Sequence, residues 1–449
     1  MERKVCIIGG NGAGLSAASQ IKKLKPHWEA VVLEKGPFIS YASCGIPYYV
    51  AGLVSDIQSL LHMSPESARK DRNIDVRLNH QVTAIKPEEK LLEISAGEKQ
   101  ITELFDILVI ATGAVPTTAG ISIDSAKRIF TLRDLEEAEN LMSFIKKEKP
   151  QKCAVIGGGY IAVEMLEAFK MRGLETHLLH RREDLAKTFE KEISDKIKDE
   201  MEKQGIILNL NSEVQALEEQ KGKVNVLTNK GELTYDFVLI AVGVSPNTKF
   251  IENTDINTGI KGSISVNKYL QTNYPYIYAV GDCAQTTHII TGKPAYVPLA
   301  LKANKEGYTA GINICEENSL EFPGTMETAI TKFFDLGVAR TGLSLEEARK
   351  NFPDAVKYNF SSPAKVDYFP GAGLLDSIII VNKKDGRILG AQLAGPVDAV
   401  KRIDVYASVI HRRMTLDEVF ELDLSYSPPY SPVFDPVLLA ARVGKKVIS

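Results

Sequence analysis

The residue with the clearest chemical potential is Cys44, which lies in the segment SYASCGIPY at residues 40–48. Proline is tolerated in the first turn of a helix, so Pro47 predicts a helix from Ile46 to Leu53 with Cys44 at or just before its N-terminus. The dipole and the free N–H groups of a helix N-terminus lower the pKa of a thiol. We therefore predict a reactive thiolate that attacks disulfide sulfur, and the alternative is a small buried residue.

The other four cysteines have plainer interpretations. Cys6 and Cys153 fall in apolar strand-like runs, Cys283 follows a Gly-Asp pair, and Cys315 lies on a late helical pattern. No two of the five form a CxxC pair, and the seven histidines show no metal-ligand spacing. We expect no metal, no disulfide framework and a reducing, cytoplasmic location.

Two glycine turns must position this chemistry, and the first follows the apolar run VCII at residues 5–8. Gly9, Gly10 and Gly14 open a small-residue helix whose N-terminal N–H groups suit a pyrophosphate. Asn11 occupies the position where a second glycine is usual. Glu34 ends the next apolar run, twenty residues past Gly14, and this spacing predicts that its carboxylate binds ribose hydroxyls.

The second glycine turn follows the apolar run CAVI at residues 153–156. Gly157 and Gly159 fit the same phosphate-binding pattern, with alanine as its accepted third residue. The next apolar run ends in His180, Arg181 and Arg182, where an acid is usual. A guanidinium pair suits the 2′-phosphate of NADP, whereas a carboxylate repels it. We therefore expect NADPH at this turn, with NADH as the alternative.

A further pair of segments is also duplicated. Residues 106–116 read DILVIATGAVP, and residues 236–246 read DFVLIAVGVSP. Each predicts a buried strand that breaks into a glycine turn, at Gly113 and at Gly243. One glycine motif is weak support for a nucleotide site, but two parallel sets make chance a poor explanation.

The composition is that of an ordinary soluble globular protein. The 449 residues are 44% hydrophobic and 25% charged, and this length suggests two or three domains. A formal charge of −3 gives no electrostatic reason to expect nucleic acid or membrane binding. No run is long enough to span a bilayer.

A third apolar run, IYAVGDCA at residues 277–284, ends in a Gly-Asp pair. With the two glycine turns, it resembles the pyridine nucleotide-disulfide oxidoreductases. The resemblance implies an α/β fold with two Rossmann-like dinucleotide-binding domains and a C-terminal α+β dimerisation domain. It implies an FAD domain at residues 1–113 and 248–323, an NAD(P)H domain at residues 114–247, and the dimerisation domain at residues 324–449.

The resemblance also implies cofactor contacts at matched motif positions. Asp282 is expected to contact the ribityl chain of FAD, and a solvated acid at a strand end is the alternative. The other cofactor positions lie in the glycine turns and at strand ends: Ala111, Thr112, Gly113, Tyr160, Glu164 and Gly243.

The absence of a second cysteine near Cys44 restricts the resemblance to one branch of the family. The dithiol cycle of glutathione and lipoamide reductases is not expected without it. The pattern SxxxCGxPY instead resembles the single-cysteine branch of coenzyme A-disulfide reductases, NADH oxidases, NADH peroxidases and polysulfide reductases. Gly12 stands where the peroxidases and many oxidases carry histidine, which argues against an enzyme specialised for hydrogen peroxide.

The segment YSPPYSPVFDP at residues 426–436 resembles one that the partner subunit contributes to the redox site of coenzyme A-disulfide reductases. The resemblance implies that Tyr426, Tyr430 and Tyr368 lie at this site, where a phenol protonates a leaving thiolate, and it implies a homodimer. Packing at a dimer interface is the alternative for these tyrosines. Phe434 replaces a typical lysine and is expected to pack on the partner's flavin, which weakens the prediction of strict coenzyme A specificity.

A coenzyme A substrate needs an elongated cationic groove. Five residues match groove positions of the reductase family, with Lys22 and Arg72 as the candidates for phosphate binding: Ser19, Lys22, Ser40, Ser43 and Arg72. A solvated surface charge is the alternative for each basic residue.

The sequence therefore predicts an enzyme that moves electrons from NAD(P)H through FAD and Cys44 to a disulfide, with coenzyme A disulfide as the expected substrate. One alternative is an NAD(P)H oxidase or a polysulfide reductase, in which the cysteine cycles through sulfenate or persulfide. A more remote alternative is a redox-sensing flavoprotein.

Overall fold

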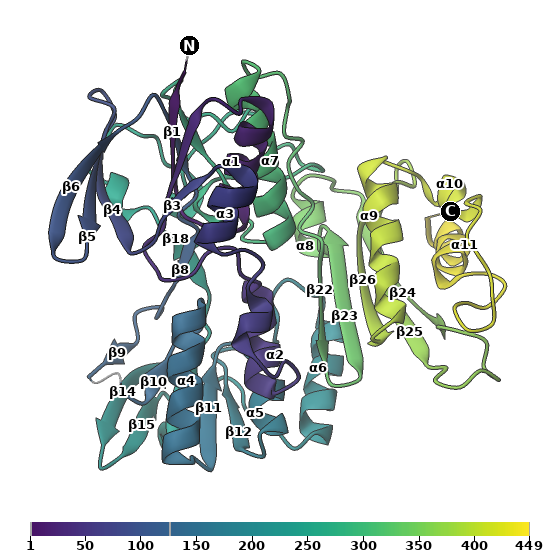
Figure 1. Ribbon diagram of the computed structural model, residues 1–449. Helices are drawn as coiled ribbons and strands as arrows, with labels where there is room; N and C mark the ends of the chain where they lie inside the picture. Colours follow the sequence, from purple (N-terminus) through teal and green to yellow (C-terminus); the bar gives the residue numbers. More distant parts are fainter. Residues whose placement is uncertain (1, 125–126, 449) are drawn as a thin grey trace.

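The computed structural model describes residues 2–124 and 127–448 and divides into three parts (Figure 1). The first is a parallel sheet in the order β19-β7-β1-β2-β3. Its three inner strands are almost continuously buried, as expected for a parallel sheet covered on both faces. The strands are β1 (Lys4–Ile8), β2 (Glu29–Leu33), β3 (Asp75–Arg77), β7 (Ile107–Ile110) and β19 (Ile277–Ala279).

Helices α1 (Gly12–Leu24), α3 (Pro65–Arg72) and α7 (Ala300–Cys315) accompany this first sheet (Figure 1). Glycines allow α1 and α7 to pack very closely. A Cβ at Gly307 would lie 2.1 Å from the carbonyl oxygen of Ala13, and one at Gly311 would lie 2.9 Å from that of Ala17. The position of α7 is therefore fixed against the helix that follows the first glycine turn.

The second part is another parallel sheet, in the order β10-β17-β11-β12-β13. Its strands are β10 (Ile129–Phe130), β11 (Lys152–Ile156), β12 (Glu175–Leu179), β13 (Ile207–Asn209) and β17 (Phe237–Ile240), and its helices are α4 (Leu135–Glu148), α5 (Tyr160–Met171) and α6 (Lys191–Lys203). Phe237 packs edge-on against Phe130, Phe144 and Phe169, which seals α4 and α5 onto the sheet.

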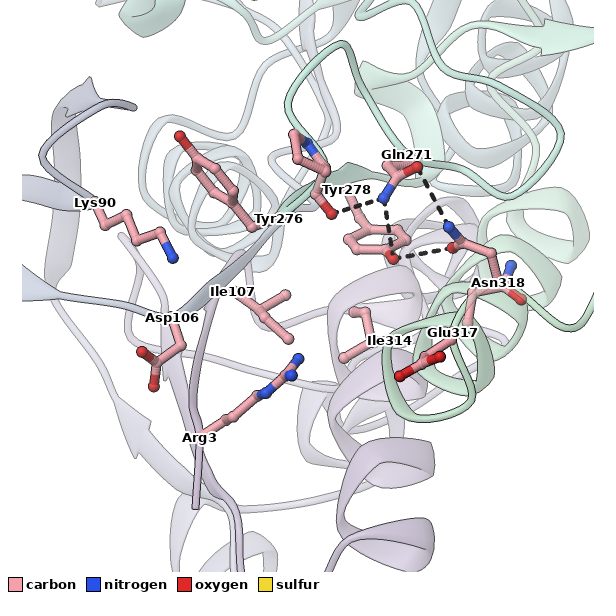
Figure 2. A pocket seen from close by; sticks show the side chains of 12 residues that line it. Arg3, Lys90, Asp106, Ile107, Gln271, Tyr276, Tyr278, Ile314, Glu317 and Asn318 are labelled. Carbon is pink, nitrogen blue, oxygen red and sulfur yellow. Dashed lines mark hydrogen bonds between the residues drawn. The ribbon is translucent and has the colours of Figure 1, made fainter. Parts of the chain in front are cut away.

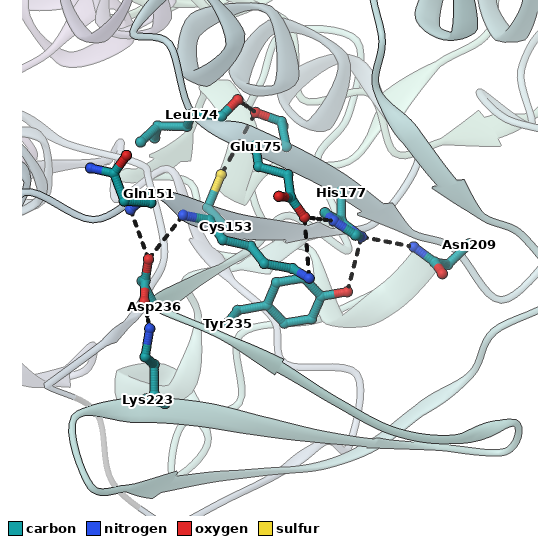
Figure 3. A network of polar contacts seen from close by, with 11 residues as sticks. Gln151, Cys153, Leu174, Glu175, His177, Asn209, Lys223, Tyr235 and Asp236 are labelled. Carbon is teal, nitrogen blue, oxygen red and sulfur yellow. Dashed lines mark hydrogen bonds and ion pairs between the residues drawn. The ribbon is translucent and has the colours of Figure 1, made fainter.

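A polar network lies at the amino ends of these strands (Figure 3). The carboxylate of Asp236 accepts from the backbone N–H of Gln151 at 2.7 Å, and the ring of His177 bonds Glu175 at 2.9 Å and the Tyr235 hydroxyl at 3.3 Å. The members of this network bond to one another. The network therefore stabilises the amino end of the sheet, which is opposite the second glycine turn.

The duplication extends to the smaller sheets. Each parallel sheet carries an antiparallel three-strand meander, and β8 pairs with β18 in antiparallel fashion between them. The meanders are β4 (His80–Lys86), β5 (Leu91–Ala96) and β6 (Lys99–Leu104), and β14 (Val214–Gln220), β15 (Lys223–Thr228) and β16 (Gly231–Tyr235); β9 (Ser122–Ile123) extends the second one. The remaining short strands are β8 (Ala114–Pro116), β18 (Val244–Pro246), β20 (Thr286–Thr287) and β21 (Pro294–Ala295).

The third part is an antiparallel sheet in the order β22-β23-β26-β25-β24, drawn in green to yellow at the right of Figure 1. Its strands are β22 (Ala329–Phe333), β23 (Leu336–Gly342), β24 (Ala355–Pro363), β25 (Leu374–Asn382) and β26 (Ile388–Pro396), with helices α8 (Leu345–Arg349), α9 (Ile403–His411), α10 (Leu416–Phe420) and α11 (Pro436–Ile448). The α/β fold class predicted from the sequence is confirmed. Across the described residues, no helix combines the length and the apolar character needed to cross a membrane.

Candidate active site

Cys44 lies in a 3₁₀ turn, Ser43–Gly45, that leads directly into helix α2 (Ile46–Ala51). Pro47 is in the first turn of α2, as predicted, and the helix stops two residues before the expected Leu53 because Gly52 adopts a left-handed φ of 85°. Cys44 is exposed, whereas the four other cysteines of the chain are buried. This exposure leaves Cys44 as the thiol available to a substrate.

The missing side chain of Gly45, next to the thiol, serves packing within the protein. A Cβ at Gly45 would lie 2.4 Å from Cδ2 of Leu60. The glycine therefore makes room for Leu60, which packs behind the turn.

Helix α5 of the second part supports the Cys44 helix. Arg172, at the end of α5, donates from Nε to the carbonyl oxygen of Val50 at 2.6 Å. Glu164, on the same helix, accepts a hydrogen bond of 2.7 Å from the hydroxyl of Thr331 in β22. All three parts of the molecule therefore meet around the cysteine helix, which Figure 1 shows between the two parallel sheets.

The protein groups around Cys44 act against the expected low pKa. Although the Cys44 side chain reaches solvent, the protein packed around the sulfur partly desolvates it, and this desolvation raises the pKa of the thiol above its ordinary value. The carboxylate of Glu164 raises the pKa further. Arg133 opposes this shift, and Asp282 reinforces it. The protein groups alone therefore do not give Cys44 the lowered pKa that we predicted, because desolvation and the Glu164 carboxylate both raise the pKa of the thiol.

The first glycine turn has the geometry of a phosphate cradle. Gly9 has a φ of 109°, and a Cβ there would lie 2.3 Å from the carbonyl oxygen of Ala111. A Cβ at Gly14 would lie 2.0 Å from the Gly9 carbonyl oxygen. Asn11, the departure from the usual motif, is the N-cap of α1, and its side chain accepts from the N–H of Gly12 at 3.0 Å. A capping residue in that position is compatible with the fold, which explains why the turn does not need a second glycine.

Glu34 is held beside this turn by backbone donors. Its carboxylate accepts from the N–H of Gly10 at 2.7 Å and from that of Gly36 at 2.9 Å. Each carboxylate oxygen keeps further acceptor capacity, so Glu34 is fixed where the fingerprint requires a ribose acceptor.

Asp282 carries an unsatisfied buried acceptor. Its Oδ2 accepts from the guanidinium of Arg133 at 2.7 Å, whereas its Oδ1 is buried without a hydrogen-bond partner in the described structure. Buried polar atoms are rarely left unpaired, so this oxygen suits a hydroxyl donor of a ligand. The glycine cradle, Glu34 and Asp282 together fit FAD.

The second glycine turn repeats the first. Gly157 has a φ of 133°, and a Cβ there would lie 2.2 Å from the carbonyl oxygen of Ala241, the counterpart of Ala111. Gly159 is the N-cap of α5, and a Cβ added there would meet no atom of the described protein within 4 Å beyond its chain neighbours, so the helix N-terminus is open to a ligand. The hydroxyl of Tyr160 is buried without a hydrogen-bond partner among the described residues. These features fit a second dinucleotide.

The basic residues after β12 separate into two kinds. His180 bonds the carbonyl oxygen of Asp184 at 3.1 Å, and burial lowers its pKa, so it contributes no cation at neutral pH. Arg181 and Arg182 are exposed and form no ion pair with other described residues. The two arginines therefore remain free to bind phosphate.

A surface groove of about 800 Å³ lies between α1, α3 and α7. It brings together four of the five predicted substrate residues, Ser19, Lys22, Ser40 and Arg72, whereas Ser43 lies in the turn with Cys44. Arg72 donates to the Ser19 hydroxyl at 2.6 Å and remains exposed.

The phosphate-binding prediction is wrong for Lys22. Its ammonium is buried and donates to the carbonyl oxygens of Pro26 and Trp28, each at 2.6 Å. Burial also lowers its pKa. The exposed cations of the groove are Arg72 together with Lys23 and Lys70, which the sequence analysis did not select.

The tyrosines predicted for the redox site lie on the third part of the molecule, away from α2 within one chain. Tyr368 is 73% exposed, Tyr430 75% and Tyr426 47%. Phe434 is 47% exposed and stacks on Phe420, with ring centroids 6.4 Å apart. The chain does not bring these side chains to Cys44, so their predicted contact requires a second subunit.

A second groove, of about 450 Å³, opens at the amino ends of the first sheet (Figure 2). Arg3 and Asp106 lie just before β1 and β7, and the Tyr278 hydroxyl donates to Asn318 at 3.0 Å. None of the predicted site residues lines this groove, which is at the opposite end of the sheet from the glycine turns.

Sequence reasoning did not select Arg133 or the pairing of Glu164 with Thr331. Arg133 lies between recognisable elements and is brought to Asp282 by tertiary structure alone. Glu164 was selected as a nucleotide contact, and its effect on Cys44 depends on how α5 packs against α2. No local pattern in the sequence signals either contact.

Comparison with known proteins follows the same division of the chain. Residues 3–307 match the family model described as pyridine nucleotide-disulphide oxidoreductase, and residues 328–437 match the dimerisation domain of that family. The chain is 37% identical over 446 residues to an NAD(P)H coenzyme A polysulfide/persulfide reductase of Pyrococcus horikoshii, covering 99% of each. It is 33% identical over 430 residues to the coenzyme A disulfide reductase of Staphylococcus aureus, covering 95% of this chain and 96% of the relative. The structure of reduced Bacillus anthracis CoADR-RHD is similar with a TM-score of 0.96 and 31% identity, over 100% of this chain and 81% of that chain.

Proposed function

Because this chain belongs to the pyridine nucleotide-disulphide oxidoreductase family, whose members use FAD and NAD(P)H, we propose that it reduces coenzyme A disulfide through Cys44. The observation that carries the proposal is the exposure of Cys44 on the turn that leads into α2, between the two parallel sheets, while every other cysteine is buried. The coenzyme A disulfide reductase name of a relative that spans almost the whole chain supports this substrate.

We assign the cofactors to the two cradles. Residues 1–113 and 248–323 form the FAD domain, with Gly9, Gly14, Glu34 and Asp282 as its contacts, and residues 114–247 form the NAD(P)H domain. When bound, FAD supplies the two electrons that reopen a disulfide formed on Cys44. Arg181 and Arg182 bind the 2′-phosphate of NADPH.

The substrate binds with its phosphates on the exposed cations of the groove, Arg72, Lys23 and Lys70. The Cys44 thiolate attacks one sulfur of the disulfide, so that a mixed disulfide forms and one thiolate leaves with a proton from a tyrosine. Two electrons and one proton then release the second thiol and restore the Cys44 thiolate, and a second proton restores the tyrosine hydroxyl. Each cycle consumes one NAD(P)H, one proton and one disulfide and yields two thiols.

We propose that the enzyme is a cytoplasmic homodimer in which residues 324–449 form the subunit interface. Tyr426, Tyr430 and Tyr368 of the partner subunit then complete the site, with Phe434 beside the flavin. A tyrosine hydroxyl that donates a hydrogen bond to the sulfur favours the thiolate, which offsets the effect of burial and Glu164 on the pKa of Cys44. The match to a dimerisation domain and the exposure of these rings support this arrangement.

A polysulfide or persulfide is the second candidate substrate. The Pyrococcus horikoshii relative carries that activity in its name, and Phe434 departs from the lysine expected of coenzyme A-specific enzymes. The same Cys44 nucleophile serves both substrates, since each presents a sulfur–sulfur bond.

Steady-state rates of the holoenzyme with NADPH or NADH, against coenzyme A disulfide, polysulfide and oxygen, test the proposal. We expect coenzyme A disulfide to give the highest kcat/KM, and a higher value for polysulfide selects the second candidate. The Cys44→Ser variant should keep its FAD and lose disulfide turnover. Undiminished turnover by this variant would contradict the assignment of Cys44.

A further inference from the structure

Two residues of α7 form a buried ion pair that takes no part in the reaction proposed above. Lys302 and Glu306 lie one helical turn apart and are 4% and 0% exposed. The ammonium of Lys302 and Oε2 of Glu306 are 3.0 Å apart. Burying two charges is costly even when they are paired, so a pair in this position calls for a structural or functional reason.

Both side chains bind the backbone of the Gly281–Asp282 turn. Oε2 of Glu306 accepts from the N–H of Gly281 at 2.8 Å. The ammonium of Lys302 donates to the carbonyl oxygen of Gly281 at 2.8 Å and to that of Ala284 at 3.2 Å. The pair therefore holds the turn in two ways: Glu306 accepts from its N–H group, and Lys302 donates to its carbonyl oxygens.

The same helix fixes the first glycine turn. A Cβ at Gly307, the residue after Glu306, would lie 2.1 Å from the carbonyl oxygen of Ala13, which precedes Gly14. Gly281 has a φ of 78°, and a Cβ there would lie 3.0 Å from Cβ of Ala13. Helix α7 therefore sets the distance between the phosphate cradle and the turn that carries Asp282.

Asp282 itself keeps one buried oxygen without a partner among the described residues, while its other oxygen is held by Arg133. An acceptor of this kind contributes to binding only when its backbone is held in place, because a mobile turn would have to be ordered by the ligand. We propose that Lys302 and Glu306 are positioning residues for FAD, which hold the Gly281–Asp282 turn in register with the first glycine turn.

The protonation of Glu306 provides a signature of this role. Burial raises the pKa of Glu306 to about 7, against the lowering effects of Lys302 and of the Gly281 N–H, and Asp282 raises it as well. The charged residues of α1, Lys22 and Lys23, lie in its last turn, whereas Ala13 is in its first turn. The protonated carboxyl is a weaker acceptor for the Gly281 N–H and leaves Lys302 without its counter-charge, so the hold on the turn weakens as the pH falls below about 7.

Titration of the apoprotein with FAD, followed by flavin fluorescence, tests the proposal without any substrate and so independently of the function proposed above. The Lys302→Met/Glu306→Met variant removes both charges while keeping side-chain bulk, and we expect its FAD affinity to fall about ten-fold or more. Lys305→Met, on the exposed face of the same helix, is the matched control and should bind FAD as the wild type does. Wild-type affinity in the double variant would overturn the proposal.

The Glu306→Gln variant keeps an oxygen acceptor for Gly281 and cannot titrate. Between pH 8 and pH 6 we expect FAD affinity to fall for the wild type and to stay constant for this variant. The pH profile decides the question if the double variant fails to fold, as judged by thermal unfolding of the apoprotein. A Glu306→Gln variant that binds FAD as tightly as the wild type at pH 8 would refute the positioning role, because this variant lacks the negative charge that holds Lys302 and the Gly281 N–H.

Discussion

The guanidinium of Arg402 donates to the backbone carbonyl oxygen of Tyr430 at 2.6 Å. It also forms an ion pair of 2.8 Å with Asp435 and donates to the carbonyl oxygen of Ala364 at 3.2 Å. Ala364 opens the loop that carries Tyr368. One largely buried side chain therefore holds both of the segments whose tyrosines are proposed to reach the partner's Cys44.

Releasing these segments should impair catalysis while leaving nucleotide binding intact. In Arg402→Met/Asp435→Asn, the buried carboxylate is not left unpaired, and the asparagine still caps α11 through the N–H of Val437. We expect kcat with coenzyme A disulfide to fall about ten-fold or more and KM for NADPH to stay constant, since a general acid contributes about 10²–10⁴-fold and a displaced one loses part of that contribution. Light scattering should show a dimer. The exposed neighbour Lys401→Met is the control, and an unchanged kcat in the double variant would mean that Arg402 does not position the tyrosines.

The local sequence pattern is sufficient to predict where the two glycine cradles lie. Gly9 and Gly157 were selected from spacing alone, and both take positive φ angles with the carbonyl oxygens of Ala111 and Ala241 directly opposite. A turn of this kind is encoded within a few residues, because only glycine fits the backbone conformation. The duplicated strands then fix how each cradle sits on its sheet.

The contacts that a side chain makes in the folded protein are harder to predict from the sequence. Lys22 lines the groove for which it was predicted, but its long side chain bends to the carbonyl oxygens of Pro26 and Trp28, which the sequence pattern does not reveal. The pKa of Cys44 depends on Glu164, which is 120 residues distant in the chain by their numbers and is brought near by the packing of α5 against α2. Sequence patterns place residues on elements, whereas tertiary contacts decide their charge and partners.

The Glu164 carboxylate should make the reactivity of Cys44 depend on pH in a predictable direction. Because the pKa of Cys44 is raised, the thiol predominates at neutral pH, and alkylation of the apoprotein by iodoacetamide should accelerate only as the pH rises through that pKa. Glu164→Gln keeps an acceptor for Thr331 and removes the negative charge, so its alkylation profile should shift to lower pH. Mass spectrometry checks that Cys44 is the labelled residue, and Cys44→Ser should take up no label because the other cysteines are buried. A profile that does not move would show that the Glu164 carboxylate does not contribute to the pKa of Cys44.

The arginine pair after β12 should determine the choice of nicotinamide nucleotide. Arg181 and Arg182 are exposed, and neither forms an ion pair in the described part of the chain. In Arg181→Gln/Arg182→Gln we expect KM for NADPH to rise about ten-fold or more, since a hydrogen bond to a charged group contributes about 1.5–3 kcal/mol. KM for NADH, which has no 2′-phosphate, should change little. Equal increases for both nucleotides would point to a damaged domain rather than a lost phosphate site.

Lys22 and Arg72 line one groove, but substitution by methionine should affect different properties at the two positions. We expect a change in substrate binding for Arg72 and a change in stability for Lys22. Arg72 is exposed, so Arg72→Met should raise KM for coenzyme A disulfide about ten-fold, because a guanidinium–phosphate contact is charge-assisted, and should leave the melting temperature unchanged. Lys22→Met leaves the carbonyl oxygens of Pro26 and Trp28 without their donor, so it should lower the free energy of unfolding by about 1–3 kcal/mol with KM almost constant. Thermal unfolding and steady-state kinetics on both variants separate the two effects. A large rise in KM for Lys22→Met in a protein that melts as the wild type does would return Lys22 to the phosphate site.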